Sequence, residues 1–371
     1  MEQAAIAITI FVVTAAVSAL LVPRVIALSH HLNLIDQPGP RRVHTKPVPR
    51  SGGLAVFLAF VVGVALSFSL GVERYSDEVE RIALLLAGSA LIVAIMLYDD
   101  ALGISPRSKL LLQIGVALVV VLPRLRGRSH GIVIDQFNAP HFGIVTLPLG
   151  IALVFTVFWI VGMMNTVNWL DGLDGLASSV TLVACGVLFL HTYFWPRNDP
   201  QFTISILPLA LGAALIGFLP FNWHPARIIL GDTGANFLGF ALAVLAIIGG
   251  AKIATALLAV GLPILDVAWV IFYRIVHGQS PVKADRGHLH HRLLDQGWSQ
   301  AQIVAFVAGV SAAFGALALI LPTREAKLVA MMALGLVLLG TVGGMAIRGK
   351  RPRRPRDRKR TAPTTMIPGR E

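Results

Sequence analysis

Apolar runs of transmembrane length recur from one end of this chain to the other, and no other feature constrains its fold as strongly. A bilayer-spanning helix needs about 20 consecutive, mainly apolar residues. Apolar residues make up 56% of the chain and charged residues 13%, whereas soluble domains contain roughly 25% charged residues. We therefore predict an all-α, multi-pass membrane protein. Eleven predicted transmembrane helices fit the apolar runs, at approximately 4–22, 54–72, 80–97, 109–123, 148–166, 175–194, 203–219, 236–250, 253–276, 300–321 and 326–347.

The distribution of Lys and Arg predicts how these helices are oriented. An odd number of spans places the termini on opposite sides, and basic residues are enriched in cytoplasmic segments. With the N-terminus outside and the C-terminus in the cytoplasm, 22 of the 31 Lys and Arg fall inside. The exception is one predicted outside loop, which holds Arg124, Arg126 and Arg128. The same loop continues into 131–146, where apolar and polar residues alternate around Asn138 and predict a small periplasmic β-hairpin.

The net charge of +12 comes mainly from the C-terminal end. Residues 348–371 carry a net charge of +8 and are rich in Pro and Arg. This composition predicts a disordered cytoplasmic tail close to anionic lipid headgroups. No folded basic domain or aromatic platform accompanies it, so we do not expect nucleic-acid binding. The sequence therefore divides into a transmembrane domain over 1–347 and a tail over 348–371.

Polar residues cluster in the stretch that follows the fifth predicted span. Asp171 and Asp174 are three positions apart, so on a helical turn they would share a face, and Asn168 would lie on the same stripe. Gly172 and Gly175 would leave room for a phosphate or a metal to approach the backbone. The alternative is a helix cap or turn that is simply rich in Asp, Asn and Gly.

Further acidic residues lie at two other predicted cytoplasmic helix ends. Asp99 and Asp100 are adjacent, which is tolerated when a cation lies beside them or when one carboxylate holds a proton; a solvated loop edge is the alternative. Lys109 would place a positive charge at the same membrane boundary, although snorkelling also explains it. Asp232 stands between glycines before an apolar helix, where it could cap that helix or bind a divalent ion.

The predicted loop after the ninth span contains three histidines and an arginine. His288, His290, His291 and Arg292 supply donors suited to phosphate oxygens. Adjacent histidines fit zinc poorly, because they cannot face one ion from a helix as an i, i+4 pair can. A solvated basic loop is the remaining alternative.

In the first predicted cytoplasmic loop, 44–53 is a Pro-rich basic stretch that either follows the positive-inside rule or borders a binding cleft.

Taken together, these motifs resemble those of the polyprenyl-phosphate N-acetylhexosamine-1-phosphate transferases, membrane enzymes that begin lipid-linked glycan synthesis in bacteria. The resemblance covers nearly the whole chain and keeps the family's motif order. It implies an enzyme of the bacterial plasma membrane with a cytoplasmic active site, in which undecaprenyl phosphate attacks the β-phosphate of a UDP-N-acetylhexosamine and UMP leaves. The matching motifs are 44–53, Tyr98-Asp-Asp, Asn165–Ala177, Gly231-Asp-Thr-Gly and the loop Ala284–Leu293.

The resemblance also implies roles for individual side chains. Asp171 and Asp232 would bind Mg²⁺, for which Mn²⁺ is an alternative, with Asn168 close to the metal and the pyrophosphate. Asp99 or Asp100 would act as the base or position the lipid phosphate. The remaining implied residues would contact the substrates: Lys46, Lys109, Asp174, His288, His290, His291 and Arg292.

The sequence of residues 288–292 also helps to distinguish between branches of this family. His-Leu-His-His-Arg at 288–292 departs from the three consecutive histidines of the peptidoglycan branch, which transfers phospho-N-acetylmuramoyl-pentapeptide. It resembles the branch that uses UDP-N-acetylglucosamine for teichoic acid, O-antigen or arabinogalactan linkers. The sequence assigns neither the downstream glycan nor the oligomeric state, so a homodimer stays open.

An ion-coupled transporter is the competing class of protein, because Asp266 within a predicted span also suits an ion path. A scaffold or lipid binder is the third class.

Overall fold

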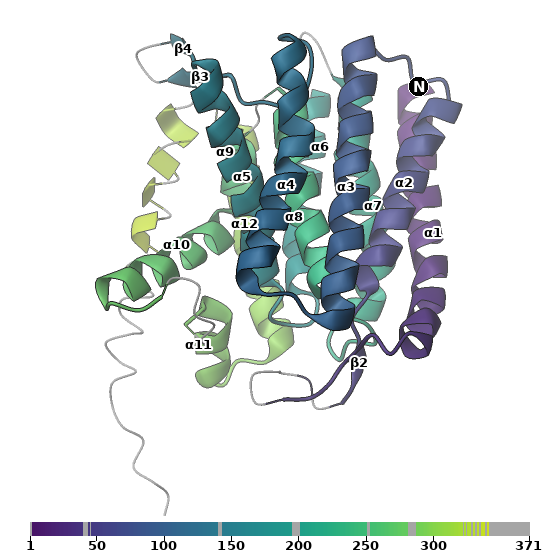
Figure 1. The fold of residues 1–371 in the computed structure, drawn as a ribbon, viewed down its shortest axis with the longest axis vertical. Helices are drawn as coiled ribbons and strands as arrows, with labels where there is room; N and C mark the ends of the chain where they lie inside the picture. The colour runs from purple at the N-terminus through teal and green to yellow at the C-terminus, as the bar shows by residue number, and fades with distance from the viewer. Residues whose placement is uncertain are drawn as a thin grey trace, which may run out of the picture.

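The computed structural model is a bundle of long helices that lie roughly side by side (Figure 1). It describes residues 2–39, 44, 46–139, 143–194, 201–250, 253–280, 287–321, 323, 325–327, 329–330, 332–333, 335–337 and 340. Nine helices in this part of the chain are long and apolar enough to cross a membrane. They are α1 (Glu2–His31), α2 (Gly52–Ser69), α3 (Ser76–Leu102), α4 (Pro106–Val121, continued by the 3₁₀ segment η1, Leu122–Arg126), α5 (Leu149–Leu170), α6 (Leu176–Phe194), α7 (Phe202–Asn222), α8 (Gly231–Ile248) and α12 (Gln300–Ile320).

These helices confirm the prediction of an all-α, multi-pass membrane protein. The described residues contain nine candidate spans, or ten if one bent pair counts as a span, where the sequence predicts eleven. Most of the eleventh predicted span, 326–347, and the whole predicted tail, 348–371, lie outside the described residues.

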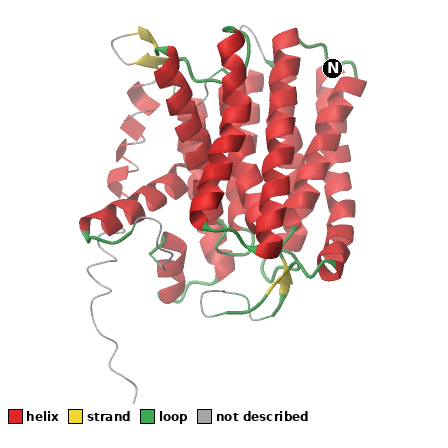
Figure 2. Cartoon of the chain, in the orientation of Figure 1, coloured by secondary structure: helices red, strands yellow, loops and turns green. Residues whose placement is uncertain are grey.

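Short strands occupy the connections at the two ends of the bundle (Figure 2). In the α1–α2 connection, β1 (Ile35–Asp36) pairs antiparallel with β2 (Val48–Pro49). At the opposite end, β3 (Gln136–Ala139) pairs antiparallel with β4 (Gly143–Thr146). The second pair confirms the β-hairpin predicted within 131–146.

The span predicted over 253–276 is not one continuous helix. The chain instead forms α9 (Ile253–Ala259) and α10 (Gly261–Val276), which are bent by 79° relative to each other. Pro263 explains the break, because it lacks an amide N–H and its ring clashes with the carbonyl of the residue four positions earlier, Ala259. In Figure 1, α10 lies across the direction of the long helices. The short helix α11 (Leu289–Asp295) follows near the same end of the bundle as β2.

Helix α8 forms the centre of the bundle. Every residue of α8 is buried except Asp232, and the helix packs against α2, α3 and α5. Helices in lipid associate through close packing and interhelical hydrogen bonds, because the surrounding lipid is as apolar as the side chains. One close approach joins α2 to α8, where Gly53 lies against the backbone of Gly234. The start of α8 is therefore positioned by a glycine-to-glycine contact.

We expect Gly53→Ala to destabilise the protein by about 1–3 kcal/mol, because an added methyl group would collide with the backbone of Gly234. The matched control is Gly115→Ala in α4, where a methyl group would meet no neighbouring atom. Thermal unfolding of the two variants in detergent tests this contact. Equal melting temperatures for both variants would contradict the tight α2–α8 packing.

Candidate active site

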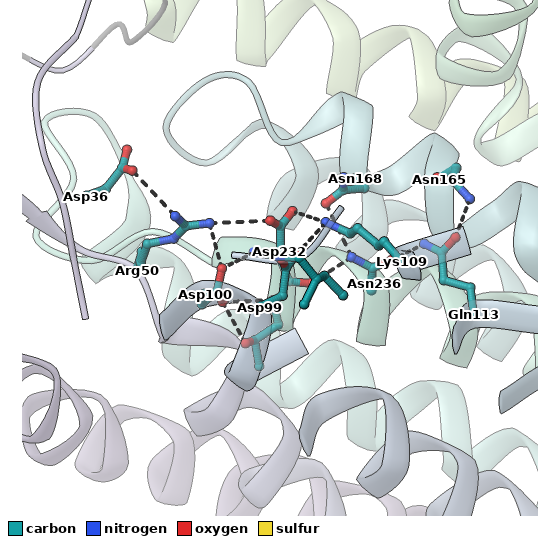
Figure 3. A network of polar contacts seen from close by, with 12 residues as sticks. Asp36, Arg50, Asp99, Asp100, Lys109, Gln113, Asn165, Asn168, Asp232 and Asn236 are labelled. Carbon is teal, nitrogen blue, oxygen red and sulfur yellow. Dashed lines mark hydrogen bonds and ion pairs between the residues drawn. The ribbon is translucent and has the colours of Figure 1, made fainter. Parts of the chain in front are cut away.

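Polar side chains from separate parts of the chain meet at one end of the bundle (Figure 3). Successive helices alternate in direction, so the end of α3, the start of α4, the end of α5 and the start of α8 reach the same end. The connection between β2 and α2 adds a further residue at this end. The residues brought together are Arg50, Asp99, Asp100, Lys109, Gln113, Asn165, Asn168, Asp232 and Asn236.

Two cations hold three carboxylates in this cluster. Lys109 Nζ lies 3.0 Å from Asp99 Oδ2 and 2.9 Å from Asp232 Oδ1. Arg50 Nη2 lies 2.6 Å from Asp100 Oδ1 and 3.3 Å from Asp232 Oδ2. Burial alone would lower the pKa of Arg50, but the carboxylates of Asp100, Asp232 and Asp36 outweigh it and raise that pKa above its ordinary value. Asp232 is thus shared between Lys109 and Arg50, and both cations stay charged beside it.

The two adjacent carboxylates of α3 have different structural roles. Asp100 accepts hydrogen bonds from the amide nitrogens of Asp232 (3.1 Å) and Thr233 (3.0 Å) and from the Thr233 hydroxyl (2.6 Å). It therefore caps the N-terminus of α8, where helical N–H groups lack partners and the helix dipole favours negative charge. Asp99 instead accepts from the Ile104 amide nitrogen at 2.7 Å and contacts Lys109. The Asp100 side chain has no exposed surface, whereas that of Asp99 is 7% exposed.

A chain of buried and half-buried amide side chains connects α4, α5 and α8 next to the carboxylates. Asn165 Nδ2 donates to Gln113 Oε1 at 2.9 Å, and Gln113 Nε2 donates to Asn236 Oδ1 at 2.6 Å. Asn236 Nδ2 then donates to Asn168 Oδ1 at 3.4 Å and to the Asp232 carbonyl at 2.9 Å. Such a network of satisfied polar groups is stiff in a low-dielectric interior. It orients Asn168 beside the start of α8.

The prediction that Asp171 and Asp174 share a helical face is wrong. Helix α5 ends at Leu170, and 171–175 form a turn in which Gly175 adopts a φ of +77°. Asp174 points to the α7–α8 connection, where its Oδ2 lies 2.7 Å from His224 Nδ1 and accepts from the Ala226 amide at 3.1 Å. The backbone already leaves the helical conformation at Asp171, whose ψ is 48°, so the three-residue spacing no longer aligns the carboxylates.

The histidine loop, residues 287–296, packs against this turn. The ring centroids of Trp169 and His288 are 6.2 Å apart, and the His290 ring occupies the space above Gly172. The prediction that Gly172 leaves room for a ligand is therefore corrected, because the imidazole fills that space. Asp266 of α10 fixes the loop, accepting from the Leu289 amide at 2.9 Å and lying 2.9 Å from His288 Nδ1.

The side chains of the histidine loop differ in environment. His290 is buried, and its Nε2 has no hydrogen-bond partner within the described chain. Burial, and then the rings of His291 and His288, hold the pKa of His290 well below its usual value, so the ring is neutral. The ring centroids of His290 and His291 lie 4.4 Å apart. Arg292 Nε donates to the Gly287 carbonyl at 2.8 Å.

The structure brings Arg50, rather than Lys46, to the carboxylates. Lys46 is exposed and makes no ion pair or hydrogen bond with any described residue. Arg50 is not among the predicted site residues, although it lies in the predicted basic stretch 44–53. Gln113 and Asn236 are not among them either, although polar residues inside predicted spans are costly in lipid and therefore indicate a polar site.

The oxygen atoms near the start of α8 suit a hard divalent cation. The Asp171 carboxylate has no hydrogen bond or ion pair within the described residues. Burial, and then the charges of Asp232, Asp100 and Asp174, raise the pKa of Asp171 to about 8. Mg²⁺ is usually held by one or two carboxylates together with substrate phosphates. No group of three or more His, Cys, Asp or Glu in the described ranges could hold a metal by itself.

A multi-pass bundle with a charged site at its helix ends defines a membrane enzyme that handles a polar substrate at the lipid boundary. Residues 82–250 match the model of glycosyl transferase family 4. A probable undecaprenyl-phosphate N-acetylglucosaminyl 1-phosphate transferase of Bacillus subtilis is 32% identical over 81% of this chain and 83% of its own. A decaprenyl-phosphate N-acetylglucosaminephosphotransferase of Mycobacterium tuberculosis is 31% identical over 76% of this chain and 74% of its own length. A phospho-N-acetylmuramoyl-pentapeptide-transferase of Halalkalibacterium halodurans is 30% identical over 84% and 94%.

The chain belongs to glycosyl transferase family 4, as its motifs predict. It is a membrane transferase that moves an N-acetylhexosamine 1-phosphate group to a polyprenyl phosphate.

We expect Asp100→Asn to destabilise the protein more than Asp99→Asn does. The first change weakens the cap of α8 and leaves Arg50 with less opposing charge, at a cost of about 3 kcal/mol or less because the Arg50 side chain is 21% exposed. The second change affects the single backbone contact with Ile104 and the ion pair with Lys109. Thermal unfolding of both purified variants is the measurement, and an equal loss of stability would refute a special capping role for Asp100.

Proposed function

We propose that this protein transfers N-acetylglucosamine 1-phosphate from UDP-N-acetylglucosamine to undecaprenyl phosphate and releases UMP. The observation that carries the proposal is the cluster in which Lys109 and Arg50 share Asp232 at the membrane boundary. The printed names of the Bacillus subtilis and Mycobacterium tuberculosis relatives support the sugar. The acceptor in the Bacillus subtilis name, undecaprenyl phosphate, supports the lipid.

In the proposed reaction an oxygen of the lipid phosphate attacks the β-phosphorus of the UDP-sugar. The bond from the β-phosphorus to the bridging oxygen breaks, and UMP leaves with that oxygen. Phosphoryl transfer depends chiefly on positioning and charge neutralisation, which this site supplies at helix ends. Lys109 faces both Asp99 and Asp232, so it is placed to contact the phosphates of either substrate. Asp99 is the better placed of its pair to position or deprotonate the lipid phosphate, because Asp100 caps α8.

We further propose that Asp171 and Asp232 bind Mg²⁺, with Asn168 close by. Bound Mg²⁺ would neutralise charge on the pyrophosphate during transfer. In the described residues the Asp171 carboxylate has no competing partner, and Asp232 lies next to the amide network that orients Asn168. The histidine loop, with Asp174 on the turn it covers, would contact the sugar and the pyrophosphate through His288, His290, His291 and Arg292.

A phospho-N-acetylmuramoyl-pentapeptide donor is the second candidate, favoured by the 30% identity to the Halalkalibacterium halodurans relative. Purified protein in detergent would be assayed for UMP release with each donor and undecaprenyl phosphate. We expect kcat/KM for UDP-N-acetylglucosamine to exceed those for UDP-N-acetylgalactosamine and UDP-N-acetylmuramoyl-pentapeptide by at least about 10², since a site that pairs with substrate hydroxyls discriminates strongly. Faster turnover of the pentapeptide donor would reverse the assignment. Decaprenyl phosphate in place of undecaprenyl phosphate tests the acceptor length.

We expect transfer to require a divalent cation. Excess chelator should abolish UMP release, and added Mg²⁺ should restore it. Asp232→Asn should lower kcat/KM by about 10² or more, because loss of this charge costs roughly 3 kcal/mol in the transition state. A buried residue away from the cluster provides the control: Cys185→Ala in α6 should keep near-normal activity. Full activity of the wild-type enzyme in excess chelator would exclude the metal.

We also propose that the active site faces the cytoplasm, where nucleotide sugars are found. The support is the excess of Lys and Arg in the loops at that end of the bundle. A cysteine introduced at the exposed Ser280, in a Cys185→Ala background, should react with a membrane-impermeant reagent only after cells are opened. Labelling of Ser280→Cys in intact cells would invert the orientation.

A further inference from the structure

An arginine cluster at the far end of α4 takes no part in the proposed reaction. Arg124 and Arg126 belong to η1, and Arg128 follows it. Helix α4 begins near the active site with Lys109 and ends at this cluster, beside the β3–β4 hairpin at the opposite end of the bundle (Figure 1). Basic residues are uncommon at the end of a bundle away from its other positive loops. The proposed reaction therefore does not explain why three arginines lie at this end of α4.

The segment that follows the cluster has a fixed shape. Glu80 of α3 lies 2.6 Å from His130 Nδ1 and accepts from the Gly131 amide at 3.4 Å. The amide of Ile132 donates to the Val120 carbonyl at 2.9 Å, and the amide of Ile134 donates to Thr156 at 2.9 Å. Ile132 and Ile134 are buried. The loop is thus pinned to three helices, so the cluster is presented by a rigid frame.

Two adjoining cavities lie against this frame. One of about 320 Å³ is lined by Arg124, Arg126 and Arg128, and another of about 290 Å³ by Arg81, Arg124 and Arg128. Asp135, the one acidic residue lining them within the described chain, forms an ion pair with Arg124.

Among the remaining charges near the cavities, Arg126 lies within electrostatic range of the Glu80 carboxylate, but no described residue forms a direct ion pair with Arg126 or Arg128. Arg81 is paired with Asp77 at 3.4 Å, and Glu80 is engaged by His130. The side chains of Arg126 and Arg128 make no hydrogen bond with any described residue either. A guanidinium presents a planar set of N–H donors that matches phosphate oxygens. The cavities are therefore suited to a phosphate-bearing anion.

The apolar surface beside the cavities indicates where that anion comes from. Leu122 and Leu125 of η1 are exposed, the second to 63%, and Leu149 and Ile151 at the start of neighbouring α5 are exposed as well. On a membrane-spanning bundle these side chains face lipid. A phospholipid whose phosphate group contacts Arg126 and Arg128 could place its acyl chains along α4 and α5.

We propose that this cluster is a binding site for the phosphate headgroup of an anionic phospholipid, separate from the active site. A lipid, rather than a soluble phosphate, fits because the exposed Leu125 and Leu149 line the same cavity as the arginines. The site would hold the α3–α4–α5 end of the bundle at the membrane surface. It is independent of the sugar and acceptor assigned to the enzyme.

Site-specific lipid quenching tests the proposal. A fluorophore would be attached to Leu125→Cys in the Cys185→Ala full-length chain, and the protein placed in phosphatidylcholine vesicles with increasing fractions of brominated phosphatidylglycerol. The reference label is Leu20→Cys on α1, a leucine that is also 62% exposed. We expect phosphatidylglycerol to be preferred over phosphatidylcholine at Leu125 and not at Leu20.

The two arginines are then removed with a matched control. Arg126→Gln combined with Arg128→Gln should lower the relative binding constant for phosphatidylglycerol at Leu125 at least about fivefold, whereas Arg24→Gln, at another exposed arginine, should leave it unchanged. The single variants give the same test if the double variant folds poorly. An unchanged preference in these variants, or an equal loss in Arg24→Gln, overturns the site. Relief of the quenching by inorganic phosphate at constant ionic strength overturns the lipid assignment in favour of a soluble anion.

Discussion

The start of α8 depends on one carboxylate that comes from another helix. Asp100 satisfies the first N–H groups of α8 and accepts the Thr233 hydroxyl, while Arg50 neutralises it from a third segment. An uncapped helix end inside a membrane bundle would leave several buried donors without water or partners, each at a cost of several kcal/mol. The same contact places Asp232 between Lys109 and Arg50. A single interaction therefore both caps α8 and positions the carboxylate that we propose as a metal ligand.

The buried polar side chains inside the bundle are also paired with one another. Gln113 and Asn236 are almost completely buried, yet each donates and accepts hydrogen bonds along the chain from Asn165 to Asn168. Buried amides are tolerable only when their donors and acceptors are paired. The network fixes the relative positions of α4, α5 and α8 next to the charged cluster at this end of the bundle. The network thereby stiffens this part of the bundle next to the charged cluster.

The histidine loop is held in place by contacts with segments that are distant in the sequence. Asp266, in the broken ninth span, holds His288, and the His290 ring rests on Gly172 in the turn after α5. The break at Pro263 turns α10 away from the direction of the long helices, and Asp266 of α10 anchors the histidine loop. The histidine loop and the turn that carries Asp171 are thus packed together at this end of the bundle.

The sequence by itself determined the membrane fold, most of the spans, the hairpin near Asn138 and the motifs that meet at one end, because apolar length and alternating helix direction are local properties. It did not determine which side chains touch. Only the tertiary structure showed that Asp100 caps α8, that Asp174 turns away to His224, and that Arg50 reaches the carboxylates while Lys46 does not. Such partners are set by packing between segments far apart in the chain, where a glycine turn or a proline break redirects a side chain, and no spacing along one segment encodes that geometry.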